Sequence, residues 1–579
     1  MVHIIAWAML FFVTACATSK KSLIDEQSKL VHLTLLGIND VHGAIEESAV
    51  KAQGKSIKAG GFAALKAYVD AAREANPNTF LFAAGDLFQG TPLSNMFLGQ
   101  SIIPAYNKLK ITAATMGNHE LDYGQLAYKS ILHSINFPFL IGNIREKKSP
   151  DSLPFFNAGN ILPYKIIKVE GISVGIMALT TLSTPEDTGP TNSAGLEFIN
   201  YETSAKNSLS SLRKEGAEVI LLLVHDGGVC DMSKSPEEGD AACINTDPVS
   251  KLLEKLPKGS IHAVIAGHIH SPQAHFIQGV PVIQNKDTAR SMGRIDLWLR
   301  RDFLGLKKGE AQVVVKAEVF RPQFLCHQVF KNYNSCDEKE LSTMKSDLGE
   351  IIPARYEGKS IVIDNSIMIE ADHYKKQIAP ILNKVAAILP KTLVNERSKE
   401  SYAGNCAADV EKIGFEKLTG KKVDVFYVNS GKIRANFPEG TLRYEDIYIV
   451  MPFEFKTILA ELTGAELNQL AFKYNVRPKD ISIVSEGWQI LLKPNFPKHA
   501  GLRRPNGQIL KNGEKIKVLL ADQYLEVFPE IFEQALKEKR IFFYDKLTRD
   551  VLFEGFKASS KNLPRSCTMS EDLKRNYFL

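Results

Sequence analysis

Several hallmarks of well-known protein classes are missing from this chain of 579 residues. No stretch approaches the roughly 18 consecutive apolar residues that a membrane-spanning helix needs. Lysine and arginine nowhere form a dense block and the formal net charge is only +6, so nucleic-acid binding is not indicated. The chain also lacks an internal repeat and a glycine-rich phosphate loop followed by Lys-Ser or Lys-Thr. These absences exclude transmembrane, repeat and P-loop proteins.

Cysteine is scarce, with seven residues in the whole chain. Apart from Cys16, the cysteines form two local pairs and one distant pair: Cys230 and Cys243, Cys326 and Cys336, and Cys406 and Cys567. Neither local pair has the C-x-x-C spacing of structural zinc sites. An even number of cysteines suits an oxidising compartment. We therefore expect disulfides, although the sequence does not determine their connectivity.

The N-terminal segment predicts export. The apolar run from Ile4 to Ala15 is too short to span a bilayer and is typical of a signal peptide, here residues 1–15. The segment from Val13 to Cys16 resembles a bacterial lipobox, in which the cysteine is lipidated. We expect an exported lipoprotein of the periplasm, outer membrane or cell envelope, held to a membrane only by a lipid on Cys16. The alternative is an ordinary secretory signal, and the absence of an early lysine or arginine leaves the start codon open.

The length and the order of apolar patterns predict two domains after a linker at 16–30. Between 31 and 365, short β-branched runs alternate with helical patterns, which indicates an α/β layered domain. From 366 to 579 we expect a second, smaller α/β domain. An apolar periodicity near 3.6 predicts that a long helix from Ala371 to Leu389 opens it.

Metal-ligand residues follow most of the strand-like runs of the first domain. They occur in five segments: Asn39 to Gly43, Gly85-Asp86, Gly117 to Asp122, His225 to Gly228, and Gly267 to His270. Side chains at the carboxyl ends of strands meet at one edge of an α/β sheet. Each segment alone is a weak signal, but the five in this order predict one metal centre.

Together these segments resemble the calcineurin-like metallophosphoesterases. The stretches from Gly85 to Ser94 and from Gly117 to Gly124 resemble more closely the bacterial periplasmic 5'-nucleotidase / UDP-sugar hydrolase family. That resemblance implies a β-sandwich core flanked by helices, followed by a C-terminal substrate-binding domain. It also implies a small nucleotide as substrate. We further expect a monomer that does not bind nucleic acid.

The resemblance also assigns the ligands of two divalent metal ions. One ion is expected on Asp40, His42, Asp86 and His270, and the other on Asp86, Asn118, His225 and His268, so that Asp86 bridges them. Imidazole and carboxylate ligands favour Zn, Mn, Fe or Co. By the same resemblance, His119 is expected to stabilise charge on the phosphate or the leaving group, and Asp122 is expected to orient His119. Two ions of this kind clamp phosphate oxygens and acidify an attacking water.

The expected substrate-binding residues lie in the second domain. The segment from Asn429 to Arg434, which includes Gly431, resembles the family's Asn-x-Gly-Gly-x-Arg turn, whose arginine binds the substrate phosphate. Phe453 matches a position whose ring stacks on the base, and Tyr524 is the candidate for a second ring. The alternatives are that Arg434 makes a surface ion pair and that the two aromatic residues belong to the core.

Two substitutions distinguish this chain from the family pattern and leave its substrate open. Lys432 occupies the place of the second glycine, and Phe455 that of an asparagine that binds the base. The glycine-rich loop expected after Tyr524 is also absent. The leading hypothesis is a 5'-nucleotidase. The alternatives are a phosphoesterase acting on cyclic nucleotides, nucleotide sugars or sugar phosphates, and a binding lipoprotein without catalytic activity.

Overall fold

The computed structural model describes residues 30–147, 160–188, 192–244, 246–300, 313–475, 481–492, 500–570, 572–573 and 575–578. The predicted signal peptide and Cys16 lie outside these residues. The described chain forms two compact units. Unit 1 contains residues 30–89, 98–188 and 192–371, and unit 2 contains 90–97 and 372–578.

The first sheet of unit 1 has seven strands in the order β17-β16-β1-β4-β5-β6-β8. Their bounds are β1 Leu30–Ile38, β4 Thr79–Ala84, β5 Ala113–Thr115, β6 Phe139–Leu140, β8 Ile161–Leu162, β16 Ser291–Arg300 and β17 Val314–Phe324. Strands β1, β4, β5, β6 and β8 are parallel. Their carboxyl ends therefore lie at the same edge of the sheet.

The second sheet of unit 1 has six strands in the order β14-β15-β13-β12-β10-β9. They are β9 Tyr164–Val169, β10 Ile172–Thr180, β12 Val219–His225, β13 Ala263–Ala266, β14 Gln273–Ile277 and β15 Val280–Gln284. In β12, Leu221 and Leu223 join the core that also contains Leu35 of β1 and Phe82 of β4, so this core lies between the sheets. The hydrophobic effect of burying the inner faces of the two sheets stabilises this sandwich.

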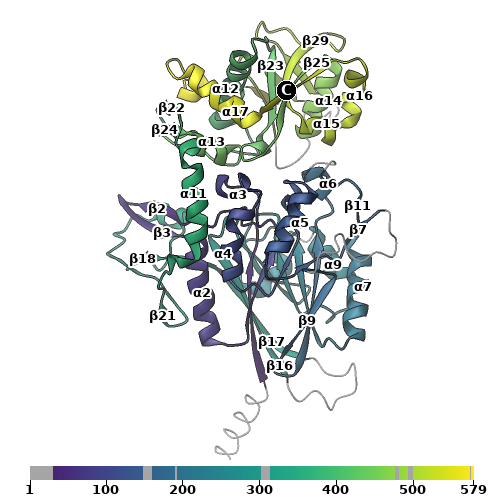
Figure 1. The fold of residues 1–579 in the computed structure, drawn as a ribbon, viewed down its shortest axis with the longest axis vertical. Helices are drawn as coiled ribbons and strands as arrows, with labels where there is room; N and C mark the ends of the chain where they lie inside the picture. Colours follow the sequence, from purple (N-terminus) through teal and green to yellow (C-terminus); the bar gives the residue numbers. More distant parts are fainter. Residues whose placement is uncertain are drawn as a thin grey trace, which may run out of the picture. The chain divides into compact units, whose positions relative to one another are not determined.

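Helices cover the outer faces of the sandwich, as Figure 1 shows. The longer ones are α2 Gly61–Ala75, α4 Ile103–Lys108, α5 Gln125–Ser134, α7 Tyr201–Lys214 and α9 Pro248–Lys255. Leu222 of β12 packs with Leu212 of α7 and Leu252 of α9 in a second apolar cluster. The predicted layered fold, a β-sandwich core flanked by helices, is therefore observed.

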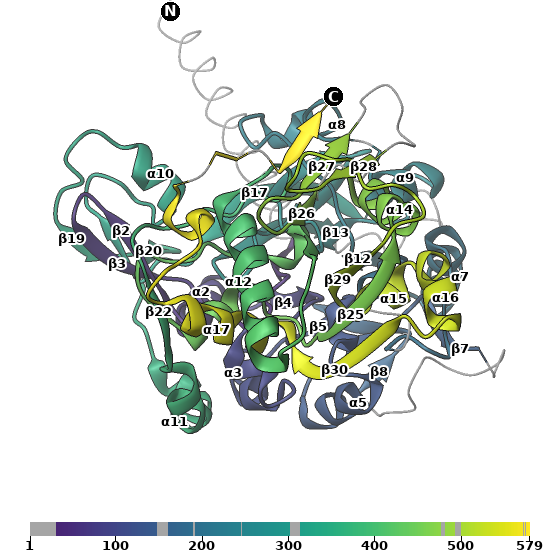
Figure 2. The same cartoon turned by 90° about the horizontal axis from the view of Figure 1, so that it is seen from above.

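Unit 2 contains a five-stranded sheet in the order β26-β23-β29-β25-β30. Its strands are β23 Val425–Asn429, β25 Lys456–Thr463, β26 Ser482–Val484, β29 Lys515–Ala521 and β30 Ile541–Leu547. Helices α12 Tyr402–Thr419 and α17 Thr548–Ser559 pack against each other on one face (Figure 2). Helices α14 Gly464–Asn475 and α16 Pro529–Lys537 cover the other face.

The remaining elements are short. Those of unit 1 are β2 Ser48–Ala52, β3 Lys55–Ala59, β7 Ile144–Glu146, α6 Thr184–Asp187, β11 Leu196–Phe198, α8 Gly239–Ala242, β18 Gln328–Phe330, α10 Glu338–Thr343, β19 Ile351–Pro353, β20 Arg355–Tyr356 and β21 Lys359–Ser360. Those of unit 2 are α3 Pro92–Asn95, β22 Val385–Leu389, β24 Gly440–Arg443, α13 Tyr444–Val450, β27 Gln489–Leu492, β28 Ala500–Arg503, α15 Gln523–Val527 and β31 Asn576–Phe578.

The long helix predicted from Ala371 to Leu389 is shorter in the structure. Helix α11 spans Ile369–Leu382, and residues 385–389 form strand β22, which pairs with β24. Pro380 lies in the last turn of α11, where its ring removes a backbone donor and favours the end of the helix. The periodicity identified the helix, but the proline decided where it stops.

Disulfide bonds join all six cysteines that follow Cys16, which confirms that these residues are paired. The bonds are Cys230–Cys243, Cys326–Cys336 and Cys406–Cys567. The last one links α12 to the 3-10 helix Arg565–Thr568 across 161 residues of sequence. Within the part of the chain that the structure describes, no helix is both long and apolar enough to cross a bilayer.

Candidate active site

The first group of expected metal ligands lies where β1 and β13 end. Asp40, His42 and His270 place one ligand atom each within 4.8 Å of the others. His270 Nε2 lies 3.1 Å from Asp40 Oδ1 and 3.1 Å from His42 Nε2. Two imidazoles and a carboxylate facing one point form a typical site for a transition-metal ion.

The second group lies beside it, after β4, β12 and β13. Asp86, His225 and His268 also place one ligand atom each within 4.8 Å of the others. The amide oxygen of Asn118 joins them, 3.1 Å from His225 Nε2 and 3.0 Å from His268 Nδ1. All four residues that the sequence assigned to the second ion therefore converge.

Asp86 lies between the two groups. Its Oδ2 atom is 3.0 Å from His225 Nε2 in the second group and 3.8 Å from His42 Nε2 in the first. Its Oδ1 atom accepts a hydrogen bond from the backbone N–H of His119 at 2.9 Å. This position is the one that a bridging carboxylate requires.

The donor atoms fit a pair of cations. Asp40 is fully buried, and its Oδ1 faces His270 Nε2 at 3.1 Å. Burial lowers the pKa of His42 and of His268 to about 4, so both imidazoles are neutral. Burial opposes a proton on His225 as well, but the Asp86 carboxylate raises its pKa to about 10. A bound cation would take the place of that proton.

Hydrogen bonds to the outer ring nitrogens orient the imidazoles. The Nδ1–H of His225 donates to the carbonyl oxygen of Ala84 at 2.7 Å. The Nδ1–H of His270 donates to Asp287 Oδ2 at 3.0 Å. Each bond leaves Nε2 directed at the centre, which is how buried metal-ligating histidines are usually held. The sequence analysis did not identify Asp287, which lies in no motif.

The backbone at the ligands is strained. Five of them adopt positive φ angles: Asp40 at 49°, His42 at 50°, Asp86 at 55°, His268 at 76° and His270 at 57°. Non-glycine residues rarely adopt this region, and such strain clusters at functional sites. The neighbouring Gly85 is needed for a second reason, because a Cβ there would lie 2.5 Å from His225 Nδ1. The sharp turns after the strands bring the side chains together.

His119 and Asp122 lie next to the ligands and form a pair of their own. His119 Nδ1 is 2.7 Å from Asp122 Oδ2, and Asp122 Oδ1 accepts a hydrogen bond from the Thr188 hydroxyl at 2.6 Å. The His119 ring lies 5.3 Å from the His42 ring, centroid to centroid. His119 is therefore oriented beside the metal ligands by the residue that the sequence predicted.

Glu120 has a structural role that sequence reasoning missed. Its buried carboxylate accepts hydrogen bonds from the backbone N–H groups of Asp86 at 2.9 Å, Leu87 at 2.6 Å and Gly117 at 2.5 Å. Burial first, and then the Asp86 carboxylate, raise its pKa to about 7. Glu120 thus joins the two turns that carry Asp86 and Asn118.

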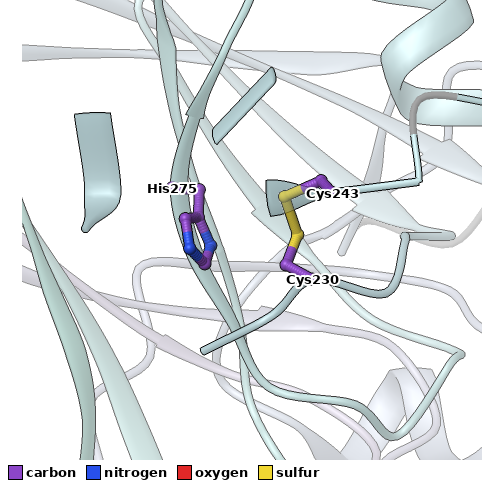
Figure 3. Close-up of side chains that lie close together, drawn as sticks. All are labelled: Cys230, Cys243 and His275. Carbon is purple, nitrogen blue, oxygen red and sulfur yellow. A yellow bond between two sulfur atoms is a disulfide. The ribbon is translucent and has the colours of Figure 1, made fainter. Parts of the chain in front are cut away.

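A third group of metal-ligand residue types has another explanation. Cys230, Cys243 and His275 also place one possible ligand atom each within 4.8 Å of the others. Figure 3 shows that the two sulfur atoms are bonded to each other beside the imidazole. A disulfide has no thiolate to offer a metal ion. This group therefore stabilises the loop between the cysteines.

The turn that follows β23 in unit 2 carries the expected phosphate-binding residues. Asn429 ends the strand, its side-chain oxygen is buried, and this oxygen accepts no hydrogen bond from a described group. Gly431 lies in the short 3-10 helix Ser430–Lys432, and Arg434 follows it with an exposed side chain. The Ser430 hydroxyl donates to the carbonyl oxygen of Arg397 at 2.5 Å. The backbone of Arg397, a further cationic residue, therefore lies next to this turn.

The two expected base-stacking rings are both buried. Phe453 is 8% exposed and stacks on Phe455, with 5.1 Å between the ring centroids. Tyr524 is 1% exposed, packs against Tyr427, and its hydroxyl accepts a hydrogen bond from the backbone N–H of Asn429 at 2.8 Å. Neither ring is exposed in the described part of the chain.

Comparison with known families covers both units. Residues 33–272 match the family described as calcineurin-like phosphoesterase, and residues 383–524 match the family described as 5'-nucleotidase, C-terminal domain. Calcineurin-like phosphoesterases bind two divalent metal ions, in agreement with the two ligand groups.

Individual proteins show the same relationship along most of the chain. A probable 5'-nucleotidase of Treponema pallidum is 23% identical over 471 residues, which cover 77% of this chain and 76% of the relative. The 5'-nucleotidase of Rattus norvegicus is 26% identical over 492 residues, which cover 80% and 76%. The crystal structure of a 5'-nucleotidase precursor from Thermus thermophilus shares the fold, with a TM-score of 0.67 and 20% identity over 91% of this chain and 96% of that one. With both domains matched in order and two metal-ligand groups in place, the chain belongs to the 5'-nucleotidase-type metallophosphoesterases.

Proposed function

We propose that the chain hydrolyses nucleoside 5'-monophosphates to nucleosides and inorganic phosphate, outside the cytoplasm. The observation that carries this proposal is the pair of ligand groups on either side of Asp86, with His119 held beside them. No activated serine or cysteine is needed, because two cations supply the electrophilic charge for an attacking water.

In this proposal Asp40, His42, Asp86 and His270 hold one divalent ion, and Asp86, Asn118, His225 and His268 hold the other. When bound, these ions neutralise the phosphate oxygens and acidify the attacking water. The protein contributes the geometry: strained turns and buried hydrogen bonds fix the ligands before substrate arrives. Zn, Mn, Fe and Co all suit this set of donors.

His119 acts on the substrate in this proposal and not on a metal ion. Its Nδ1–H donates to Asp122, which fixes the ring and stabilises the imidazolium form. The protonated ring then stabilises charge on the phosphate and donates a proton to the leaving ribose oxygen. Asp122 is in turn fixed by Thr188.

We assign substrate binding in unit 2 to the turn after β23. The guanidinium of Arg434 binds phosphate, for which its planar fork is suited. The side-chain oxygen of Asn429, which accepts no hydrogen bond from a described group, and Gly431 are assigned to contact with polar groups of the substrate. Phe453 and Tyr524 are the aromatic candidates for contact with the base.

One observation favours a second candidate function. Lys432 and Phe455 stand where the family pattern has a glycine and an asparagine, and both contact Phe453. A site altered in this way also suits phosphoesters that do not need a stacked base. Sugar phosphates, cyclic nucleotides and nucleotide sugars are the candidates. A binding lipoprotein without turnover is the remaining alternative.

For its location, we propose an exported monomer anchored by a lipid on Cys16. Support comes from the lipobox-like segment, from the three disulfides and from the precursor form of the Thermus thermophilus relative. Intact-mass analysis of the mature chain tests the anchor. A mature chain without lipid would leave export standing and remove the lipoprotein proposal.

A hydrolysis panel tests the function. The purified chain, loaded in turn with Zn, Mn, Fe and Co, is assayed on nucleoside monophosphates, UDP-glucose, cyclic nucleotides and sugar phosphates. Turnover of nucleoside 5'-monophosphates that is lost on chelation supports the proposal. Activity confined to another member of the panel selects an alternative, and metal binding without any turnover selects the binding protein.

A further inference from the structure

Lys432 occupies the aromatic region of unit 2. Its ammonium nitrogen lies 3.8 Å from the ring centroid of Phe455 and 5.1 Å from that of Phe453. The same nitrogen donates a hydrogen bond to the side-chain oxygen of Gln523. A lysine held by two rings and an amide is fixed in place and is not a mobile surface cation.

The ring of Phe453 is already covered by protein groups. Phe455 stacks on it with an angle of 20° between the ring planes. The guanidinium of Arg434 lies 5.1 Å from the Phe453 centroid, so two cations and one ring contact the same side chain. A nucleobase needs an open ring face to stack. Phe453, at 8% exposure, offers little of one.

Tyr524 does not offer an open ring face in place of Phe453. The side chain is 1% exposed, belongs to the apolar core of unit 2, and its hydroxyl is engaged by the backbone of Asn429. Opening this ring would break that hydrogen bond and the contact with Tyr427. Arg434, in contrast, has an exposed side chain.

The two competing contacts are of similar strength. A stacked base tightens binding about 5- to 150-fold. A cation over an aromatic ring contributes about 2- to 30-fold, and more when it is shielded from water. A base that stacks on Phe453 must first displace Lys432, so most of the gain from stacking is cancelled.

We infer that Lys432 is a specificity-determining residue that keeps nucleobases from the aromatic rings of unit 2, so that this enzyme selects substrates by their sugar phosphate. The substrate class is then 5'-phosphomonoesters of ribose, with or without a base. This inference rests on the proposed function, since it concerns the substrate of the same site.

The test compares AMP with ribose 5-phosphate, using kcat/KM on the metal-loaded full chain. For the parent enzyme, we expect the two values to lie within about threefold of each other, because the base adds almost nothing. Lys432→Gly should raise the AMP to ribose 5-phosphate ratio at least about tenfold. Lys432→Met, which removes the charge but leaves a chain over the rings, should raise the ratio less.

A matched control removes the same type of contact elsewhere in unit 2. The ammonium of Lys473 lies 5.4 Å from the ring of Phe528, outside the proposed site. Lys473→Met should leave the ratio unchanged. Thermal unfolding of the parent and of the Lys432 variants shows whether the variants fold.

Two outcomes overturn the inference. One is a parent enzyme that prefers AMP to ribose 5-phosphate more than about thirtyfold, the gain expected of an open stacking site. The other is a Lys432→Gly variant with an unchanged ratio. Both leave the proposed function intact, since AMP is still hydrolysed. Failure of metal-loaded enzyme to hydrolyse either compound overturns the proposed function instead, and the inference with it.

Discussion

The metal centre of unit 1 and the aromatic cluster of unit 2 are built in different ways. In unit 1 the backbone does the positioning: strands end at one edge, and tight turns with positive φ angles direct Asp86 and His268 inward. In unit 2 the side chains of Lys432, Phe453 and Phe455 position one another. A substitution in the first region should therefore abolish chemistry, whereas one in the second should change only which substrate is preferred.

The largest effect is expected at Asp86, where the two ligand groups meet. Asp86→Ala removes a ligand from both ions, and the lost charge stabilisation of several kcal/mol corresponds to roughly a thousandfold or more in kcat. Metal analysis should give fewer than two ions per chain. Asp240→Ala, outside both groups, is the control. Full turnover by the Asp86 variant would show that the two groups are not the catalytic centre.

His119→Ala should separate chemistry from metal binding. The variant loses a general acid, for which roughly a hundredfold or more in kcat is typical. Its metal content should stay at the parent value, because His119 belongs to neither ligand group. Asp122→Asn should have a smaller effect of the same kind. If the His119 variant loses metal, then the residue is a ligand and the assignment is wrong.

Glu120 tests whether the backbone really holds the metal centre. Glu120→Ala leaves three buried N–H groups without an acceptor, each of which costs about 1–3 kcal/mol. The free energy of unfolding of the metal-free chain should fall by several kcal/mol, measured by denaturant titration. Glu120→Gln keeps an acceptor oxygen and should lose less. Equal stability of the alanine variant and the parent would remove this role.

Arg434→Ala should lower kcat/KM for AMP and leave the metal centre of unit 1 unchanged. Loss of a charge-assisted hydrogen bond of about 1.5–3 kcal/mol corresponds to roughly 10- to 150-fold in kcat/KM for AMP. Arg565→Ala, an exposed arginine far along the sequence, should change nothing. An unchanged kcat/KM for AMP in the Arg434 variant would support the surface ion pair instead.

The smallest effect concerns Glu411 of α12, which lines a small cavity with Phe426, Val428 and Phe453. It is fully buried, and neither of its oxygens accepts a hydrogen bond from a described group. Burial raises its pKa well above the usual range. The folded chain therefore binds this proton more tightly than the unfolded chain, so stability falls as the pH rises above about 4.3.

Glu411→Gln should remove the loss of stability at rising pH. The variant should exceed the parent in Tm at pH 8, and the difference should shrink towards pH 5. Thermal unfolding of both proteins across this range, at one fixed metal concentration, gives the comparison. A difference that is independent of pH would mean that Glu411 is not held in its protonated form.

Much of unit 1 could be predicted from sequence because its signals are local. The β-branched run before His225 forms a strand, and the residue after such a strand lies at the sheet edge. The roles of Glu120 and Asp287 could not be predicted, because they depend on partners, Asp86 and His270, that are 34 and 17 residues away. No pattern within a single segment records such contacts.

Unit 2 was less predictable for the same reason. The positions of Arg434 and Phe453 follow from motifs, and the turn after β23 was expected. The burial of Tyr524 depends on a hydrogen bond to Asn429, 95 residues earlier. The contact of Lys432 with Phe455 likewise depends on how two segments meet. The sequence showed that these residues differ from the family pattern but not what the difference does.

The disulfide between Cys406 and Cys567 has a consequence for resistance to proteases. It joins the first long helix of the unit 2 sheet to the end of the chain and encloses 161 residues of sequence. A protease that cuts once anywhere inside this stretch leaves both fragments covalently joined, and the packing of α12 on α17 holds them in place. Such nicked enzyme would migrate as a single band until a reductant is added. Cleavage alone would then be a poor way to switch this enzyme off.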